Sequence, residues 1–537
     1  MADTGGERGM PAVSKSLRFI LWVFLGGVLV VAQPQPEAGQ APRPLLQRIQ
    51  QALGSGREAV ARKQLSDALE TYPRDPVLHS FLGVLEAQQN HYRAAETSFR
   101  KAIELGPDYA AAYLNLGRLY QQQGARDPQA VQKGIAVYRK LLELDPASAE
   151  AHYQIALLYS IQGASRKALA HLDRLPPDVQ RQSKTLTIRC AAQADLHETA
   201  KVERCVQDLS KSSDLDEVEV LPLLAPLAAA DEDDMAVLLL ETLSERRLAS
   251  PETLGLLAAL YEKQDKLTEA RGVYEALVAD NGPTLPRLLG LARVAYRQKD
   301  FEGTLGYLAH ARDLDPKNSG VHFFFGMVCV EMDLVVEAER SLRTAVELNP
   351  DNPYYNYALG AVIANGKKWE EAIPYFEKYC AGEPDDPRGK LALASAHFHN
   401  YQTKLASKEL EQLVNNPSTA AGARYQLGLV AIRQGDFQRA ASELEQAVRL
   451  KQDYAEAYAE LGFAYLQLDR LDEARTALES SLKLQPDGRR ANMTLLTYFR
   501  KAGDPRAKEQ AKRFAEINKR RSQRAKLLLR TIEARPY

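Results

Sequence analysis

The sequence is organised around a stretch of 34 residues, Ala455 to Gly488, that predicts two helices joined by a short turn. Four residues of its first half have the i, i+3, i+4, i+7 spacing of one helix face: Tyr458, Leu461, Gly462 and Tyr465. A second stripe of this kind begins at Ala474, after the polar turn Gln467 to Arg470. Pro486 ends the second helix, because proline lacks the amide hydrogen and clashes with the preceding turn.

The same unit recurs in phase along the chain. Small residues at its eighth position lie 34 residues apart, and prolines close several units at the same interval. These positions are Gly326, Gly360, Ala394, Gly428 and Gly462, with Gly83 and Gly117 near the start, and Pro316, Pro350 and Pro384. Because each repeat buries its apolar face on its neighbours, a chain of 537 residues built this way needs no separate globular cores.

This pattern resembles the tetratricopeptide repeat, which reads aromatic-x2-Leu-Gly-x2-Tyr, then Ala-x3-Phe, then Pro. The motif Tyr113-Leu116-Gly117-Tyr120 carries the first-helix positions, and Ala95-Phe99-Ala102-Pro107 and Ala372-Phe376-Tyr379-Pro384 follow the second-helix pattern. The resemblance implies an all-α, right-handed α-solenoid of about 14 helix-turn-helix repeats. It also implies a protein-interaction scaffold, whose partner is a protein or a peptide.

Counting outward from the strong repeats places the array at residues 42–522. The motif fades over residues 176–250, but two units of 34 fit there in register, so we interpret this region as degenerate repeats; a separate domain is the alternative. The acidic run Asp231 to Asp234 falls in a predicted turn and lacks the glycine and later glutamate of a calcium loop. Residues 523–537 are expected to end a basic helix that caps the array.

The N-terminus has the pattern of a secretory signal. Lys15 and Arg18 precede the apolar run Phe19 to Val31, and Ala32 offers a small residue for cleavage. We therefore expect a signal peptide at residues 1–32, a tether rich in Pro, Gln and Ala at 33–41, and a periplasmic or extracellular protein; the alternative is an uncleaved membrane anchor.

No arrangement of residues predicts catalysis, a metal or a cofactor, since the sequence has neither a Gly-rich phosphate loop nor a serine nucleophile elbow. The net charge of −1 gives no indication of nucleic-acid binding. His397 and His399 lie two apart on a predicted helix, so they are poorly placed to share a metal. Cys190 and Cys205 fall on the two helices of one degenerate unit, and whether they pair stays open.

The first helices carry a surplus of large apolar residues at positions 2, 5, 9 and 12, which face the concave groove in the resembled family. Aromatic side chains there offer a partner segment a large contact area. The candidate groove residues are Phe323, Tyr354, Tyr357, Phe398, Tyr425 and Phe463. The other interpretation is that they pack between adjacent first helices. An alternative function is a subunit of a membrane-associated assembly, docked through the basic C-terminal helix.

Overall fold

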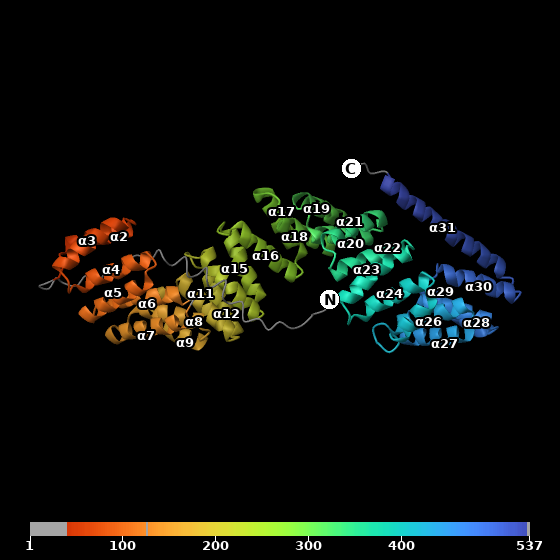
Figure 1. The fold of residues 1–537 in the computed structure, drawn as a ribbon, viewed down its shortest axis with the longest axis horizontal. Coiled ribbons are helices and arrows are strands. Elements are labelled where there is room, and N and C mark those ends of the chain that lie inside the picture. Colours follow the sequence, from red (N-terminus) through yellow and green to blue (C-terminus); the bar gives the residue numbers. More distant parts are fainter. Residues whose placement is uncertain (1–39, 125–126, 534–537) are drawn as a thin grey trace. The chain divides into compact units, whose positions relative to one another are not determined.

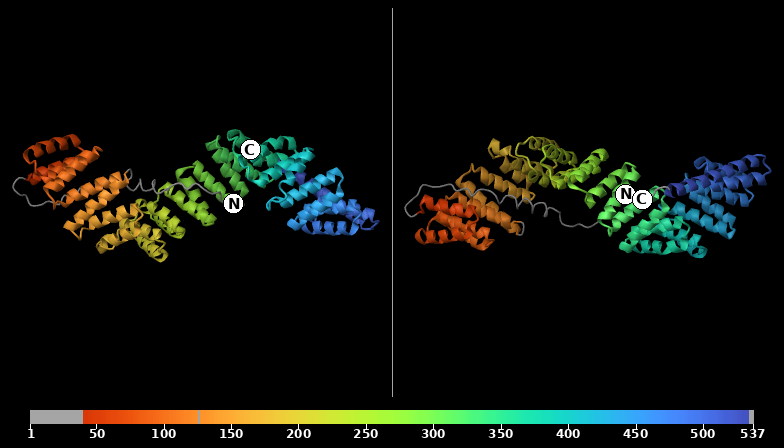
Figure 2. Two further views of the ribbon diagram at one scale, coloured as in Figure 1. Left: turned by 60° about the horizontal axis from the view of Figure 1, so that its bottom comes forward. Right: turned by 90° about the horizontal axis from the view of Figure 1, so that it is seen from above.

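The computed structural model describes residues 40–124 and 127–533, and these residues form helices joined by short turns. The predicted signal peptide and most of the predicted tether lie outside the described residues. The described chain forms two units that divide after Pro283, and each unit is described by itself. Within each unit the helices pair into antiparallel hairpins, and successive hairpins stack on one another (Figures 1 and 2).

Unit 1 contains seven hairpins in its described residues. They are α2 (Arg43–Gly54) with α3 (Glu58–Thr71), α4 (Pro76–Gln88) with α5 (Tyr92–Leu105), α6 (Ala110–Gln123) with α7 (Pro128–Leu144), α8 (Ala149–Ile161) with α9 (Ser165–Leu172), α11 (Ser183–Asp195) with α12 (Thr199–Ser210), a broken helix with α15 (Asp233–Glu245), and α16 (Pro251–Lys263) with α17 (Leu267–Asn281). The broken helix consists of α13 (Glu217–Val220), the 3-10 turn η2 (Leu221–Leu223) and α14 (Leu224–Ala229), and a short α10 (Pro177–Gln180) follows α9.

Unit 2 contains seven more hairpins in its described residues. They are α18 (Leu285–Arg297) with α19 (Phe301–Leu314), α20 (Ser319–Glu331) with α21 (Val335–Leu348), α22 (Pro353–Asn365) with α23 (Trp369–Gly382), α24 (Pro387–His399) with α25 (Thr403–Glu411), α26 (Ala420–Gln434) with α27 (Phe437–Leu450), α28 (Ala455–Gln467) with α29 (Leu471–Leu484), and α30 (Arg489–Lys501) with α31 (Ala507–Glu533). The all-α solenoid predicted from the repeats is therefore confirmed.

The small residue at the eighth position explains how closely the two helices of a hairpin approach. A Cβ atom added to Gly117 of α6 would lie 2.3 Å from Cζ of Tyr138 in α7. At Gly462 of α28 it would lie 2.6 Å from Cγ of Leu478 in α29. The predicted turn between α28 and α29 contains Asp469, whose positive φ of 58° helps the chain to reverse direction between these two helices.

The fourth position of the first helix joins one repeat to the next through a hydrogen bond. In six repeats the side chain at this position bonds to the carbonyl oxygen six residues earlier, at the end of the preceding repeat. The pairs are His79 with Pro73, Tyr113 with Pro107, His152 with Pro146, His322 with Pro316, Asn356 with Pro350 and Asn492 with Pro486.

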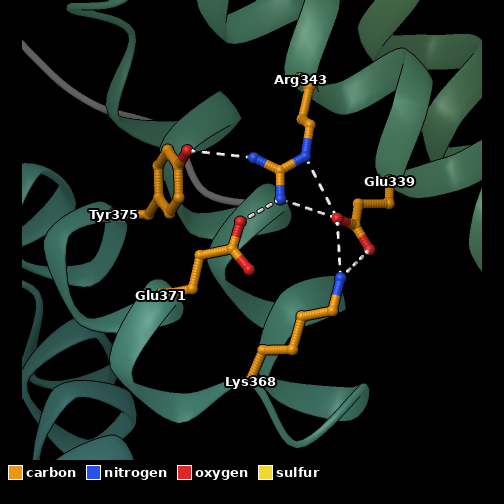
Figure 3. Close-up of polar contacts among 5 residues, drawn as sticks. All are labelled: Glu339, Arg343, Lys368, Glu371 and Tyr375. Atoms are coloured by element: carbon orange, nitrogen blue, oxygen red, sulfur yellow. Dashed lines mark hydrogen bonds and ion pairs between the residues drawn. The ribbon is translucent and has the colours of Figure 1, made fainter.

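Second helices of successive repeats are also joined by polar contacts. Figure 3 shows Arg343 of α21 between Glu339 of its own helix and Glu371 and Tyr375 of α23. Lys368, which precedes α23, lies 3.3 Å from the Glu339 carboxylate. The hydrogen bond from Arg343 lowers the pKa of Glu339, although burial acts in the opposite direction. This network fixes the register of two neighbouring repeats.

The basic helix α31 is the second helix of the last hairpin and contacts α30 and the end of the preceding repeat. Gln510 donates a hydrogen bond to the side-chain oxygen of Asn492, and Arg513 donates one to the carbonyl of Pro486. Ile517 is buried. Among the described residues, no helix is long and apolar enough to cross a membrane.

Candidate functional site

A pocket of about 890 Å³ opens on the layer of first helices in unit 1. Its walls are α8, the start of α9, α11 and the broken helix α13–η2–α14, and successive first helices contact each other here. The wall residues include those at positions 5 and 9 of their repeats, the positions predicted to face the groove. They are Tyr153 and Leu157 of α8, Thr187 and Ala191 of α11, and Ala225 of α14. We call this site the inner pocket.

The local sequence explains why there is space at this point. Pro222 and Pro226 lack the amide hydrogen needed for a regular helix, and the first helix of this repeat is interrupted by a 3-10 turn. Ala191 and Ala225 are small, so the space between α11 and α14 is not filled by their side chains. Tyr153, Leu157 and Ile188 are buried and form the apolar walls.

Two carboxylates line the inner pocket; that of Asp195 is exposed, whereas that of Glu219 on α13 is half-buried. Burial raises its pKa to about 7, and the negative charge of Asp216 acts in the same direction. A hydrogen bond from Thr187 and the charge of Lys184 lower the pKa, but these effects are smaller than that of burial. Lys184 Nζ instead lies 5.0 Å from the ring centroid of Tyr153. Among the described residues, Glu219 forms no ion pair.

A disulfide links the two helices of the repeat that forms the middle of the inner pocket. Cys190 of α11 and Cys205 of α12 are bonded, with their Cα atoms 5.5 Å apart. Cys190 stands at the eighth position, where other repeats have Gly117 or Gly462. Cys190 and Cys205, whose pairing the sequence left open, are therefore bonded at the position where the two helices of the repeat come closest.

The predicted groove residues of unit 2 have several environments. Phe323 stacks on Tyr355 of the next first helix, with ring centroids 4.6 Å apart. Tyr425 contacts Tyr454, and both belong to the apolar layer between two repeats. Tyr357 lies against Phe376 and Tyr379 of its own hairpin. The ring centroid of Phe463 lies 6.1 Å from that of Phe437, and the guanidinium of Arg490 covers the Phe463 ring. These four rings are partly buried.

Tyr354 and Phe398 represent the two extremes of exposure. Tyr354 is 53% exposed and presents its ring to solvent. Phe398 is only 4% exposed, and the Arg433 guanidinium covers its ring at 3.7 Å. The expectation that Phe398 faces a groove is therefore wrong: it packs the core, because α26 supplies an arginine long enough to cover it.

Two further predictions concern metal binding. His397 bonds to Glu409, whereas His399 stacks on Trp369 with ring centroids 4.3 Å apart, so the two rings have different partners. The acidic run begins in the predicted turn at Asp231, and its last two members lie in the first turn of α15. Negative side chains are stabilised there by the helix dipole, which accounts for them without a metal.

Comparisons with known proteins support the assignment of the helical hairpins as tetratricopeptide repeats. Family models of the tetratricopeptide repeat match residues 83–124, 137–170, 256–319, 295–362 and 431–495, and a model of anaphase-promoting complex, cyclosome, subunit 3 matches 365–447. The solved structure of the APC/C heterotetramer Cut9–Hcn1 is 16% identical (TM-score 0.36; 85% of this chain, 90% of that chain). Yeast Tom70 is 17% identical (TM-score 0.30; 86% and 99%). YrrB, described as a TPR protein with an unusual peptide-binding site, is 21% identical (TM-score 0.27; 34% and 95%).

The repeat motif is in phase along the sequence, the described residues fold into stacked helical hairpins, and repeat models match in both units. The chain belongs to the tetratricopeptide repeat proteins.

Proposed function

We propose that this repeat protein is an exported, non-catalytic scaffold that binds a segment of a partner protein in the inner pocket. The observation that carries the proposal is the pocket itself, which three consecutive first helices line with residues at positions predicted to face the groove. Apolar walls with a few polar groups are typical of ligand sites. Tyr153 and Leu157 can bury an apolar side chain, and Lys184, Thr187 and Glu219 can orient it.

The alternative of docking through the basic helix has less support, because α31 already packs on α30 through Ile517 and Gln510. A basic second helix with this packing is what a solenoid needs at its open end. The aromatic residues of unit 2 remain a second surface for a partner, with Tyr354 as its most exposed predicted member.

Filling the inner pocket tests the proposal. Ala191 is partly exposed and lines the pocket, so Ala191→Trp places a large ring where a partner side chain is expected to bind. Peptides are first selected from a displayed random library on the full chain and then titrated by fluorescence anisotropy. We expect Ala191→Trp to weaken their binding at least about tenfold, a loss of about 1.4 kcal/mol.

The matched control is Ala200→Trp on α12, at an exposed position outside the pocket lining. It should leave both the melting temperature and the peptide affinity unchanged. Equal affinities for the wild-type chain and a folded Ala191→Trp variant would overturn the assignment of this pocket.

Export is supported by two independent features. One is the basic and apolar pattern of residues 15–32, and the other is the disulfide between Cys190 and Cys205, because disulfides persist mainly outside the cytoplasm. Sequencing the N-terminus of the mature protein tests this part of the proposal. We expect Gln33 as the first residue, whereas a mature chain that retains Phe19 to Val31 would favour the membrane anchor.

A further inference from the structure

The inner pocket combines apolar walls with a single half-buried carboxylate. Tyr153, Leu157 and Ile188 are each less than a tenth exposed, and Glu219 lines the same cavity from α13. The pocket also has ionisable residues at its edge, but Arg166, Lys167 and Asp195 are exposed to solvent. Their charges are screened by water and salt, so the charge at Glu219 has the larger influence on what binds inside.

The carboxylate of Glu219 has no counter-ion in the described part of the chain. Lys184 is the cationic residue that α11 contributes to the pocket lining, and it lies over the Tyr153 ring. Glu217, two residues earlier, is already bonded to Ser250 and Thr253. Asp216 caps α13 by accepting a hydrogen bond from the Glu219 amide. The negative charges of Asp216 and Asp214 both act on the Glu219 carboxylate.

Burial of an unpaired carboxylate is costly, and a cation from a partner would offset that cost. We infer that the inner pocket takes an apolar segment of a partner protein that carries a lysine or arginine, whose cationic group pairs with Glu219. This inference rests on the proposed function, since it specifies the segment that the pocket binds.

The pairing makes binding depend on pH. A cation binds the ionised form of Glu219, and the pKa of this group is raised to about 7, mainly by burial. Affinity for a cationic segment should therefore rise as the pH increases through 7. The charged groups that act on Glu219 are Asp214, Asp216 and Lys184. Aspartate and lysine do not ordinarily titrate between pH 6 and 8, so the dependence should come from Glu219.

The probe is an array of short peptides of Ala, Leu, Ile, Phe and Ser that differ only in a central Lys, Gln or Glu. They are titrated against the full chain at pH 6 and pH 8 by fluorescence anisotropy. At pH 8 the Lys peptides should bind at least about tenfold more tightly than their Gln counterparts, as expected for a charge-assisted hydrogen bond. At pH 6 this preference should shrink several-fold.

Glu219→Gln tests the residue with almost no change of shape. The variant should lose the preference for Lys and its pH dependence but keep its affinity for Gln peptides. Glu203→Gln is the matched control, because Glu203 is an exposed carboxylate on α12 outside the pocket lining, and the variant should leave the preference intact. Equal binding of Lys and Gln peptides to the wild-type chain, or tighter binding of Glu peptides, overturns the inference alone. If no peptide binds in the inner pocket, the proposed function fails together with this inference.

Discussion

Serine at both Cys190 and Cys205 is expected to lower the free energy of unfolding of the α11/α12 hairpin by about 3 kcal/mol. The bond joins residues separated by 15 positions, and in the chain-entropy model a cross-link of this span restricts the unfolded chain by about that amount. The repeat has little else to replace the bond, because Val206 stands where Phe99 stands in the second repeat. The loss is therefore expected to be local.

Amide hydrogen exchange measures this loss directly. The most protected amides of α11 and α12 should exchange roughly a hundredfold faster in the double variant, while those of α4 and α5 should not change. A reductant should reproduce the effect in the wild-type chain and have no effect in the variant. Cys380→Ser is the control, since Cys380 is a free cysteine. Unchanged exchange in α11 after confirmed reduction would contradict the prediction.

The sequence predicted the helical hairpins well because their determinants are local. Apolar spacing defines the buried face, a small residue at position 8 allows close contact, and the turn residues are set by backbone conformation. The same logic extended into residues 176–250, where most of the motif is lost but the spacing of apolar residues persists. The structure contains two hairpins there, α11 with α12 and the broken helix with α15.

The site was harder to predict, because exposure depends on neighbours that the repeat pattern does not specify. Phe398 has a groove position, yet Arg433, one repeat later, covers it. Phe323 stacks on Tyr355 for a similar reason: two large rings on adjacent first helices reach each other. A surplus of aromatic residues therefore indicates contact between repeats as much as an open surface.

The inner pocket arises from small residues and prolines, which a pattern of large apolar residues does not indicate. Ala191 and Ala225 are small at groove positions, and Pro222 and Pro226 interrupt a first helix. Such a loss of side-chain volume between two strong walls can be recognised in the sequence. Whether it leaves a cavity depends on how closely the adjacent helices approach, which the repeat pattern does not specify.

Gly117→Ala is expected to destabilise the α6/α7 hairpin by about 1 to 3 kcal/mol, the usual cost of overpacking. The new Cβ would lie 2.3 Å from the ring of Tyr138, which is fully buried and cannot swing into solvent. Gly306→Ala in α19 is the matched control. It is also a glycine within a helix, but nothing lies within 4 Å of its added Cβ, so it should gain roughly 0.5 to 1 kcal/mol from helix propensity.

A second substitution separates steric overlap from any other effect at Gly117. Tyr138→Leu removes the ring atoms that the added Cβ would meet, and the Tyr138 hydroxyl has no hydrogen-bond partner among the described residues. Urea unfolding of the two single variants and the double variant gives the coupling energy. The double variant should be more stable than the sum of the single losses predicts, because both changes act at one contact. Additive losses would mean that Gly117 is required for a reason other than the approach of Tyr138.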